Sequence, residues 1–126
     1  MLRCLAILVA ASGALAATRV SAHHSITALY HEKQTVTVEG QLAQVHFRNP
    51  HTIVHLIVKD KTAGEVRYAV EWAAAGELEA QGVTSRTLKA GDFVVITGSP
   101  ARYAPDRRLR MTTLHRPKDN YTYDGR

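Results

Sequence analysis

Residues 35–42 read Thr-Val-Thr-Val-Glu-Gly-Gln-Leu, and this stretch decides the fold class. Apolar and polar side chains alternate along it, which is the pattern of a β-strand with one buried face. The alternation then changes phase, because Val45 and Phe47 continue the apolar set one residue out of step. Such a shift predicts a β-bulge, which bends a long strand. Asn49-Pro50 ends the strand, since proline has no backbone N–H to donate.

The segments that follow predict four more strands and a helix. Residues 52–59 and 65–72 are predicted strands joined by a hairpin loop, and residues 93–97 and 107–114 are two more. Residues 73–81 are rich in Ala, Glu and Leu, which favours a short helix. Three strands, a helix and two strands is the order of the oligonucleotide/oligosaccharide-binding (OB) fold. We therefore predict an all-β protein with a small α content, a five-stranded OB-fold-like β-barrel with one short helix between strands three and four.

Aliphatic side chains must fill most of the barrel core, because aromatic residues make up only 6% of the chain. One face of each predicted strand supplies them. The predicted core residues are Val36, Val38, Leu42, Val54, Leu56, Val70, Phe93, Val95, Leu109 and Met111. We also expect Leu29 and Tyr30, which precede the first strand, to pack on the barrel wall and to hold the N-terminal segment there.

The N-terminus has the pattern of an export signal. A positive start at residues 1–3 is followed by an uncharged apolar run over residues 4–17, which is too short to span a bilayer comfortably. Two cleavage points fit the small-x-small rule, one after Ala16 and one after Ala22, and cleavage after Ala22 is preferred. An uncleaved membrane anchor is the alternative. The pattern predicts a general secretory route, and no stable membrane span after cleavage.

The domain organisation follows from this cleavage. We expect residues 1–22 to be a signal peptide, residues 23–116 to be the barrel domain and residues 117–126 to be a polar C-terminal tail, in a periplasmic or secreted protein. The only cysteine, Cys4, would leave with the signal, which excludes disulfides and thiolate metal sites. Arg3 and Arg19 would leave with the signal, so 14 bases would face 11 acids, and this net charge of +3 is too mild to indicate nucleic acid binding by itself.

Several short motifs resemble one family of short exported bacterial proteins. They are Ala-His-His-Ser at residues 22–25, Tyr30, Val-Thr-Val-Glu-Gly at residues 36–40, Asn-Pro-His at residues 49–51 and Leu-Lys-Ala-Gly-Asp at residues 88–92. The family is the domain-of-unknown-function family 6152, and the resemblance covers residues 22–116. The resemblance implies export and the barrel fold, and it implies no particular activity.

Histidines near the predicted new N-terminus suggest metal binding. If cleavage leaves His23 first, its free amine and its ring offer two nitrogen ligands, and His24 adds another. His51 follows Asn49-Pro50 at a strand junction, so it would lie at the barrel rim, and His46 before the turn is an additional candidate ligand. An all-nitrogen set suits Cu(II). The leading hypothesis is an exported copper-type accessory protein that binds a copper ion through His23, His24 and His51; the alternative is that these are ordinary surface histidines.

Arginines gather around the last predicted loop and strand, which flank the ligand face of an OB barrel. They are Arg102, Arg107, Arg108 and Arg110. They favour a second hypothesis, a non-metal binding module that holds an anionic small molecule, a glycan or a partner protein in the barrel groove. The alternative is a solvated edge that discourages strand pairing.

Enzymatic activity and nucleic acid binding are not expected. The sequence has no Gly-x-Ser-x-Gly elbow, no phosphate loop and no His-Glu-x-x-His motif. Glu71 beside Trp72 is one candidate acid, but we expect a glutamate on the outward face of a strand to be solvated. Only Tyr103 lies near the arginines for base stacking, and an exported protein does not meet cytoplasmic nucleic acid.

Overall fold

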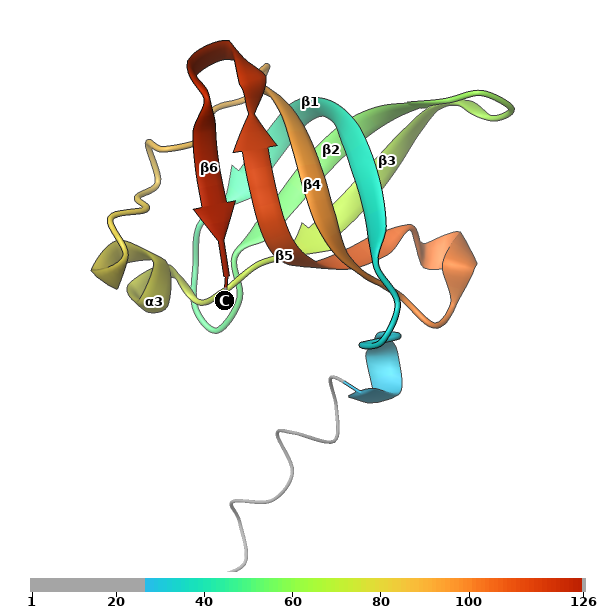
Figure 1. Ribbon diagram of the computed structural model, residues 1–126, viewed down its shortest axis with the longest axis horizontal. Coiled ribbons are helices and arrows are strands. Elements are labelled where there is room, and N and C mark those ends of the chain that lie inside the picture. The colour runs from blue at the N-terminus through green and yellow to red at the C-terminus, as the bar shows by residue number, and fades with distance from the viewer. Residues whose placement is uncertain (1–26, 126) are drawn as a thin grey trace, which may run out of the picture.

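A computed structural model of the protein describes residues 27–125 (Figure 1). Six strands lie within them: β1 (Val36–His46), β2 (Ile53–Asp60), β3 (Gly64–Glu71), β4 (Phe93–Pro100), β5 (Arg108–Arg116) and β6 (Tyr121–Asp124). The helix α3 (Ala75–Ala80) lies between β3 and β4. Two short 3-10 helices, η1 (Ala104–Asp106) and η2 (Pro117–Asp119), precede and follow β5. Residues 27–29 are also helical.

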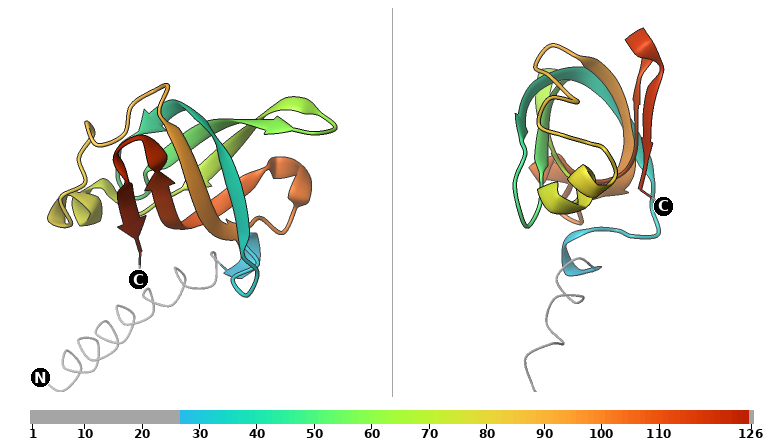
Figure 2. Two further views of the ribbon diagram at one scale, coloured as in Figure 1. Left: turned by 45° about the horizontal axis from the view of Figure 1, so that its top comes forward. Right: turned by 90° about the vertical axis from the view of Figure 1, so that its left-hand side faces the viewer.

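The first five strands close into a barrel, which confirms the predicted fold class. Their order is β3-β2-β1-β4-β5, and a parallel pairing of β3 with β5 completes the ring (Figure 2). This is the strand order of the OB fold, with α3 in the predicted place. The seam between β3 and β5 is short. It pairs Ala69 with Arg108, Val70 with Leu109 and Glu71 with Arg110.

Strand β1 bends enough to pair with β4 along its first half and with β2 along its second half. The register shifts between Leu42 and Gln44, where the change of phase in the sequence predicts a bulge. Gly40 allows the strands to approach closely, because a Cβ atom there would lie 2.2 Å from the backbone oxygen of Ile57. Gly98 has the same role in β4. The backbone itself therefore sets how tightly the barrel closes.

The barrel interior is aliphatic, as predicted, but β4 contributes different residues. The buried cluster contains Leu42, Val54, Leu56, Val70, Trp72, Leu78, Val83, Leu88, Val94, Ile96, Leu109 and Leu114. In β4, Val94 and Ile96 face the interior, whereas Phe93 is 44% exposed and Val95 is half-buried. The expectation that Phe93 and Val95 line the core is wrong by one position, because a continuous apolar run carries no alternation to fix its phase. Val36, at the start of β1, also lies at the surface.

The C-terminal segment is folded against the barrel. Residues expected to form a polar tail instead make η2 and β6, and β6 pairs antiparallel with β5. Tyr121 and Tyr123 pack against the buried cluster, and Tyr123 meets Trp72 edge to face with ring centroids 4.9 Å apart. A four-residue strand contains too few alternations to be recognised from its sequence.

Helix α3 closes one end of the barrel (Figure 2, right). Leu78 is fully buried, and Glu77 accepts a hydrogen bond from the backbone N–H that begins the helix. Gly82 follows the helix with a φ of +81°, the left-handed conformation in which a glycine commonly ends a helix. The loop between β1 and β2 rests on this helix, because Asn49 Oδ1 accepts a hydrogen bond from the Gly76 N–H.

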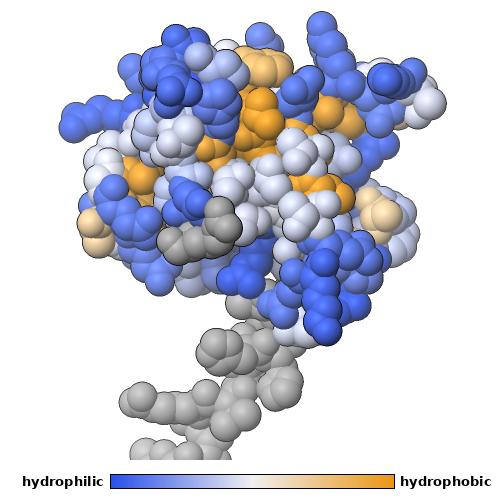
Figure 3. Space-filling view, viewed as in Figure 1, coloured by the Kyte–Doolittle hydropathy of each residue, from blue (hydrophilic) through white to orange (hydrophobic). Residues whose placement is uncertain are grey.

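The surface is mixed. The face in Figure 3 is mostly hydrophilic, with apolar side chains gathered across its middle. The large apolar side chains exposed in residues 27–125 are Leu29, Val36, Phe93 and Tyr103. No helix in this part of the chain is long and apolar enough to cross a membrane.

Candidate functional site

The carboxylate of Glu71, the last residue of β3, is the centre of a polar cluster at the barrel rim. The Tyr30 hydroxyl donates a hydrogen bond of 2.7 Å to Glu71 Oε2. His51 Nδ1 lies 3.4 Å from Glu71 Oε1, and Arg108 lies 3.8 Å from Oε2. The Glu71 side chain is only 12% exposed, so it is not the solvated acid expected from the sequence. We call Tyr30, His51, Glu71 and Arg108 the Glu71 cluster.

Strand pairing explains why these residues meet. The parallel seam sets Glu71 beside β5, two residues along from the pairing of Ala69 with Arg108. On the other side of β3 lies the start of β2, which follows His51. Thr52 there donates a backbone hydrogen bond to the Ala73 oxygen and accepts one from the Trp72 N–H. The end of β3 is thus held between the β1–β2 loop and β5. A side chain facing outward there lies within reach of both.

The segment before β1 adds Tyr30 to the cluster. Tyr30 is 1% exposed and forms a β-bridge with Ala101, which confirms that it packs on the barrel wall. Leu29 does not, because its side chain is 53% exposed. Arg102 holds the same segment by donating hydrogen bonds from its backbone N–H to the Leu29 oxygen and from Nε to the Thr27 oxygen. Burial and, second, the hydrogen bond to Glu71 raise the pKa of Tyr30 to about 12.

His51 is placed to accept a further ligand. Its side chain is 49% exposed, and its Nδ1 faces Glu71, which leaves Nε2 for another partner. The loop that carries it is held against α3 at two points, through Asn49 and through the Arg48 carbonyl, which accepts a hydrogen bond from the Ala75 N–H. The ring therefore stands beside a carboxylate and is carried by an anchored loop.

The other predicted metal ligands are distributed differently. His23 and His24 lie outside the described residues. The ring of His46, in β1, packs edge to face on that of His55 in β2, with centroids 5.4 Å apart. The structure therefore brings His46 together with His55. Within residues 27–125, no three side chains of His, Cys, Asp or Glu form a group that could hold a metal ion by themselves.

The predicted arginines do not form one free cationic patch. Arg102 hydrogen-bonds Thr27, Arg108 faces Glu71, and Arg110 lies 3.6 Å from Glu32. Arg107 stands at the end of η1 with a φ of 47°, where its N–H donates to a backbone oxygen. Most of the positive charge expected for an anionic ligand is therefore shared with acidic or carbonyl groups of the protein itself.

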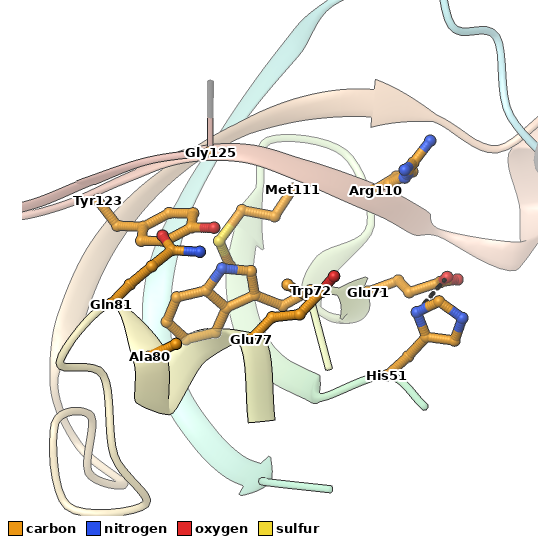
Figure 4. A pocket seen from close by; sticks show the side chains of 11 residues that line it. His51, Glu71, Trp72, Glu77, Ala80, Gln81, Arg110, Met111, Tyr123 and Gly125 are labelled. Carbon is orange, nitrogen blue, oxygen red and sulfur yellow. Dashed lines mark ion pairs between the residues drawn. The ribbon is translucent and has the colours of Figure 1, made fainter. Parts of the chain in front are cut away.

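An open pocket of about 550 Å³ adjoins the Glu71 cluster (Figure 4). Its lining includes His51, Glu71, Trp72, Glu77, Arg110 and Tyr123. Trp72 is 4% exposed, and its indole Nε1 is buried without a hydrogen-bond partner in the described part of the chain. Sequence reasoning missed Tyr123, because the segment that carries it was expected to be a tail.

Comparison with known proteins agrees with the motifs found in the sequence. The sequence profile of a family of unknown function, DUF6152, matches residues 10–109. No curated protein matches the chain. The matched range includes β1 to β4 and the start of β5, and it ends before β6. The chain therefore belongs to the domain-of-unknown-function family 6152.

Proposed function

We propose that the protein is exported and binds a copper ion at the barrel rim, through His23, His24 and His51. One observation carries the proposal: the carboxylate of Glu71 contacts both His51 and the N-terminal segment, the latter through Tyr30. The buried tyrosine fixes the segment that leads back to His23 and His24 beside the predicted third histidine.

Only a few residues separate His23 and His24 from Thr27. An extended chain spans about 3.3–3.6 Å per residue, so His24 and His23 lie within about 10–14 Å of Thr27. Thr27 Oγ1 donates to Glu32, and Glu32 faces Arg110, which lines the same pocket as His51. A continuous set of contacts therefore runs from Thr27 to the pocket.

The contact between Glu71 and His51 suits a metal ligand. A carboxylate that accepts a hydrogen bond from one ring nitrogen of histidine orients the ring and makes the other nitrogen a better ligand. Nδ1 faces Glu71, so Nε2 is the nitrogen that would bind the ion. With the amine and rings of His23 and His24, the set would reach four nitrogens, the number that tetragonal Cu(II) prefers.

The test combines processing with a titration. Mass spectrometry of the exported protein should show His23 as the first residue, and a start at Ala17 or an intact Met1 would remove the amine ligand. Trp72 is the only tryptophan of the chain and neighbours Glu71, so its fluorescence should be quenched by Cu(II) bound at His51.

We expect saturable quenching at one equivalent of Cu(II), and at least tenfold weaker binding in His51→Ala. The matched control is His115→Ala, because the His115 ring contacts Asn120 and takes no part in the cluster. Affinity that is unchanged in His51→Ala would show that the N-terminal histidines bind copper without the barrel.

A second candidate function is a non-metal binding module, and Trp72 Nε1, which has no hydrogen-bond partner among the described residues, favours it. A buried donor without a partner is costly, so a ligand or water that reaches it would be stabilised. Arg110 at the pocket edge favours an anionic ligand. Chelator-treated protein titrated with inorganic phosphate or glucuronate should then show a saturable shift of Trp72 emission, with no metal present.

A further inference from the structure

We propose a second metal site, formed by His46 and His55 on the outer face of β1 and β2 and separate from the copper site proposed above. The ring centroids of the two histidines are 5.4 Å apart, with the ring planes at 85°. The two side chains come from neighbouring antiparallel strands, where His55 pairs with Gln44, two residues before His46. Both rings are half-buried.

The spacing of the rings is close to that of two imidazoles on one ion. With metal–nitrogen distances of about 2.0–2.1 Å, two histidines at tetrahedral or square-planar angles hold their ring centroids about 4.5–5 Å apart. A small side-chain rotation closes the remaining difference. Because each ring belongs to a paired strand, the backbone that positions the pair is rigid. The site therefore needs no rearrangement of the barrel.

The surroundings of His55 keep its ring available to a metal. Its Nδ1 is buried and has no hydrogen-bond partner within residues 27–125. A coordinated ion would satisfy a ring nitrogen that the protein leaves unsatisfied.

The ligand chemistry selects the class of ion. Two imidazoles suit borderline divalent ions such as Zn(II), Ni(II) and Cu(II), whereas Mg²⁺ and Ca²⁺ prefer oxygen ligands. The side chain of Arg67, which reaches Gln44, is a nearby positive charge that opposes a cation. Removal of this charge by Arg67→Gln should therefore strengthen metal binding. We expect water molecules to fill the coordination positions that the two histidines leave open.

The site lies apart from the rim. His51 and His55 are separated by four residues of nearly extended chain, which spans about 13 Å. One ion cannot be shared across that distance. Each site can therefore be removed without removing the ligands of the other.

The experiment uses the full chain with the proposed copper site removed by His23→Ala, His24→Ala and His51→Ala. Zn(II) is titrated calorimetrically into this triple variant and into versions that add His46→Ala or His55→Ala. We expect one Zn(II) to bind the triple variant, at least tenfold weaker binding when either histidine is removed, and no change on adding His115→Ala. Adding Arg67→Gln should tighten binding about threefold or more.

Equal Zn(II) affinity with and without His46 and His55 would overturn the proposal. A second measurement covers the case in which His55→Ala unfolds the barrel. In the intact protein, nuclear magnetic resonance spectra of the imidazole rings should show Zn(II) shifting His46 and His55 together, and shifts confined to other histidines would overturn the proposal as well. Because the triple variant has no rim ligands, failure of the copper proposal leaves this result unaffected.

Discussion

Two carboxylates organise the polar groups of this barrel, and they do so in opposite ways. Asp92, before β4, is 6% exposed and lies 2.8 Å from Arg116, which is itself nearly buried. Lys118 contacts its other oxygen, and Arg116 also forms two hydrogen bonds to Asp119. We call Asp92, Arg116, Lys118 and Asp119 the Asp92 network. In the Glu71 cluster, by contrast, the ionic contacts are 3.4 and 3.8 Å long and the partners His51 and Arg108 are half exposed.

The difference indicates that the Asp92 network stabilises the fold, whereas the Glu71 cluster is suited to binding a ligand. Arg116 also donates a hydrogen bond from Nη1 to the Thr87 carbonyl, and its guanidinium lies 5.1 Å from the centre of the Tyr121 ring. The Asp92 network therefore has its main partners within the protein and joins η2 and β6 to the barrel. The Glu71 cluster keeps one tight bond, to Tyr30, and two loose contacts. Loose, partly exposed partners can change their contacts when a ligand arrives.

The largest expected effect is at Arg116. Arg116→Ala would leave Asp92 buried with part of its charge unpaired, which typically costs about 3–5 kcal/mol of the free energy of unfolding. Urea denaturation followed by circular dichroism measures the change. A loss below about 1 kcal/mol would mean that Lys118 alone compensates for Asp92, and the contrast between the two carboxylates would then disappear.

The second-largest expected effect is the weakening of the Asp92 network by acid. Burial raises the pKa of Asp92, but hydrogen bonds from Lys118, the Lys89 N–H and Arg116 outweigh burial and lower the pKa from 3.8 to about 2. Since the folded-state pKa is below the unfolded one, this stabilisation is complete above about pH 4 and is lost as the pH falls toward 2. The expected loss is about 2 kcal/mol.

Urea denaturation at pH 4 and pH 2 measures the loss, and Asp92→Asn should reduce the difference between the two. Hydrogen bonds from Ala63 and Thr62 also lower the pKa of Asp60 to about 2, so part of the pH dependence should remain. A pH dependence identical in Asp92→Asn and in the parent would contradict the assignment.

The third effect concerns the tight bond of the Glu71 cluster. Tyr30→Phe removes a hydrogen bond from a buried hydroxyl to a carboxylate, and we expect a loss of about 1.5 kcal/mol. Because the folded-state pKa of Tyr30 is raised to about 12, stability should also fall as the pH rises from 10 toward 12, and Tyr30→Phe should lessen that fall. Absorbance titration near 295 nm, with Tyr103→Phe as the exposed control, distinguishes the buried tyrosine.

The smallest effect is at Arg108. Its guanidinium is 42% exposed and 3.8 Å from Glu71, so Arg108→Ala should change the free energy of unfolding by about 0–1 kcal/mol. The same denaturation experiment used for Arg116→Ala provides the comparison. If Arg108→Ala destabilised the protein as strongly as Arg116→Ala, the two clusters would be equally structural.

The fold could be predicted because its signals are local. Alternation in β1, the bulge before Gln44 and the glycine after α3 each depend on a few neighbouring residues. The phase of β4 could not be predicted, because an apolar run from Phe93 to Ile96 reads the same on either face. Its phase is set by pairing with β1, where Val94 lies opposite Gly40.

The candidate site could be predicted only in part. Tyr30 and His51 were recognisable as a residue packed on the barrel wall and a rim histidine, but Glu71 joins them across 41 and 20 positions of sequence. Closure of the β3–β5 seam holds the end of β3 against β5, and the backbone hydrogen bonds of Thr52 hold it against the β1–β2 loop. Glu71 was expected in solvent because its position on the strand is outward, and the pattern contains no information on what covers it.

The brevity of the β3–β5 seam has a consequence for motion. A ladder that ends within a few residues has few hydrogen bonds to break. Local opening should therefore be more frequent at this seam than along the full-length ladder of β2 and β3. The amide proton of Ala69, which donates to the Arg107 oxygen across the seam, should exchange with solvent sooner than those of Val54 and Leu56. Tyr30 and His51 contact the two carboxylate oxygens of Glu71 at the end of this seam. An ion held between the N-terminal segment and His51 would link the two and reduce opening of the seam. Its binding would then be visible as slower hydrogen exchange at the end of β3.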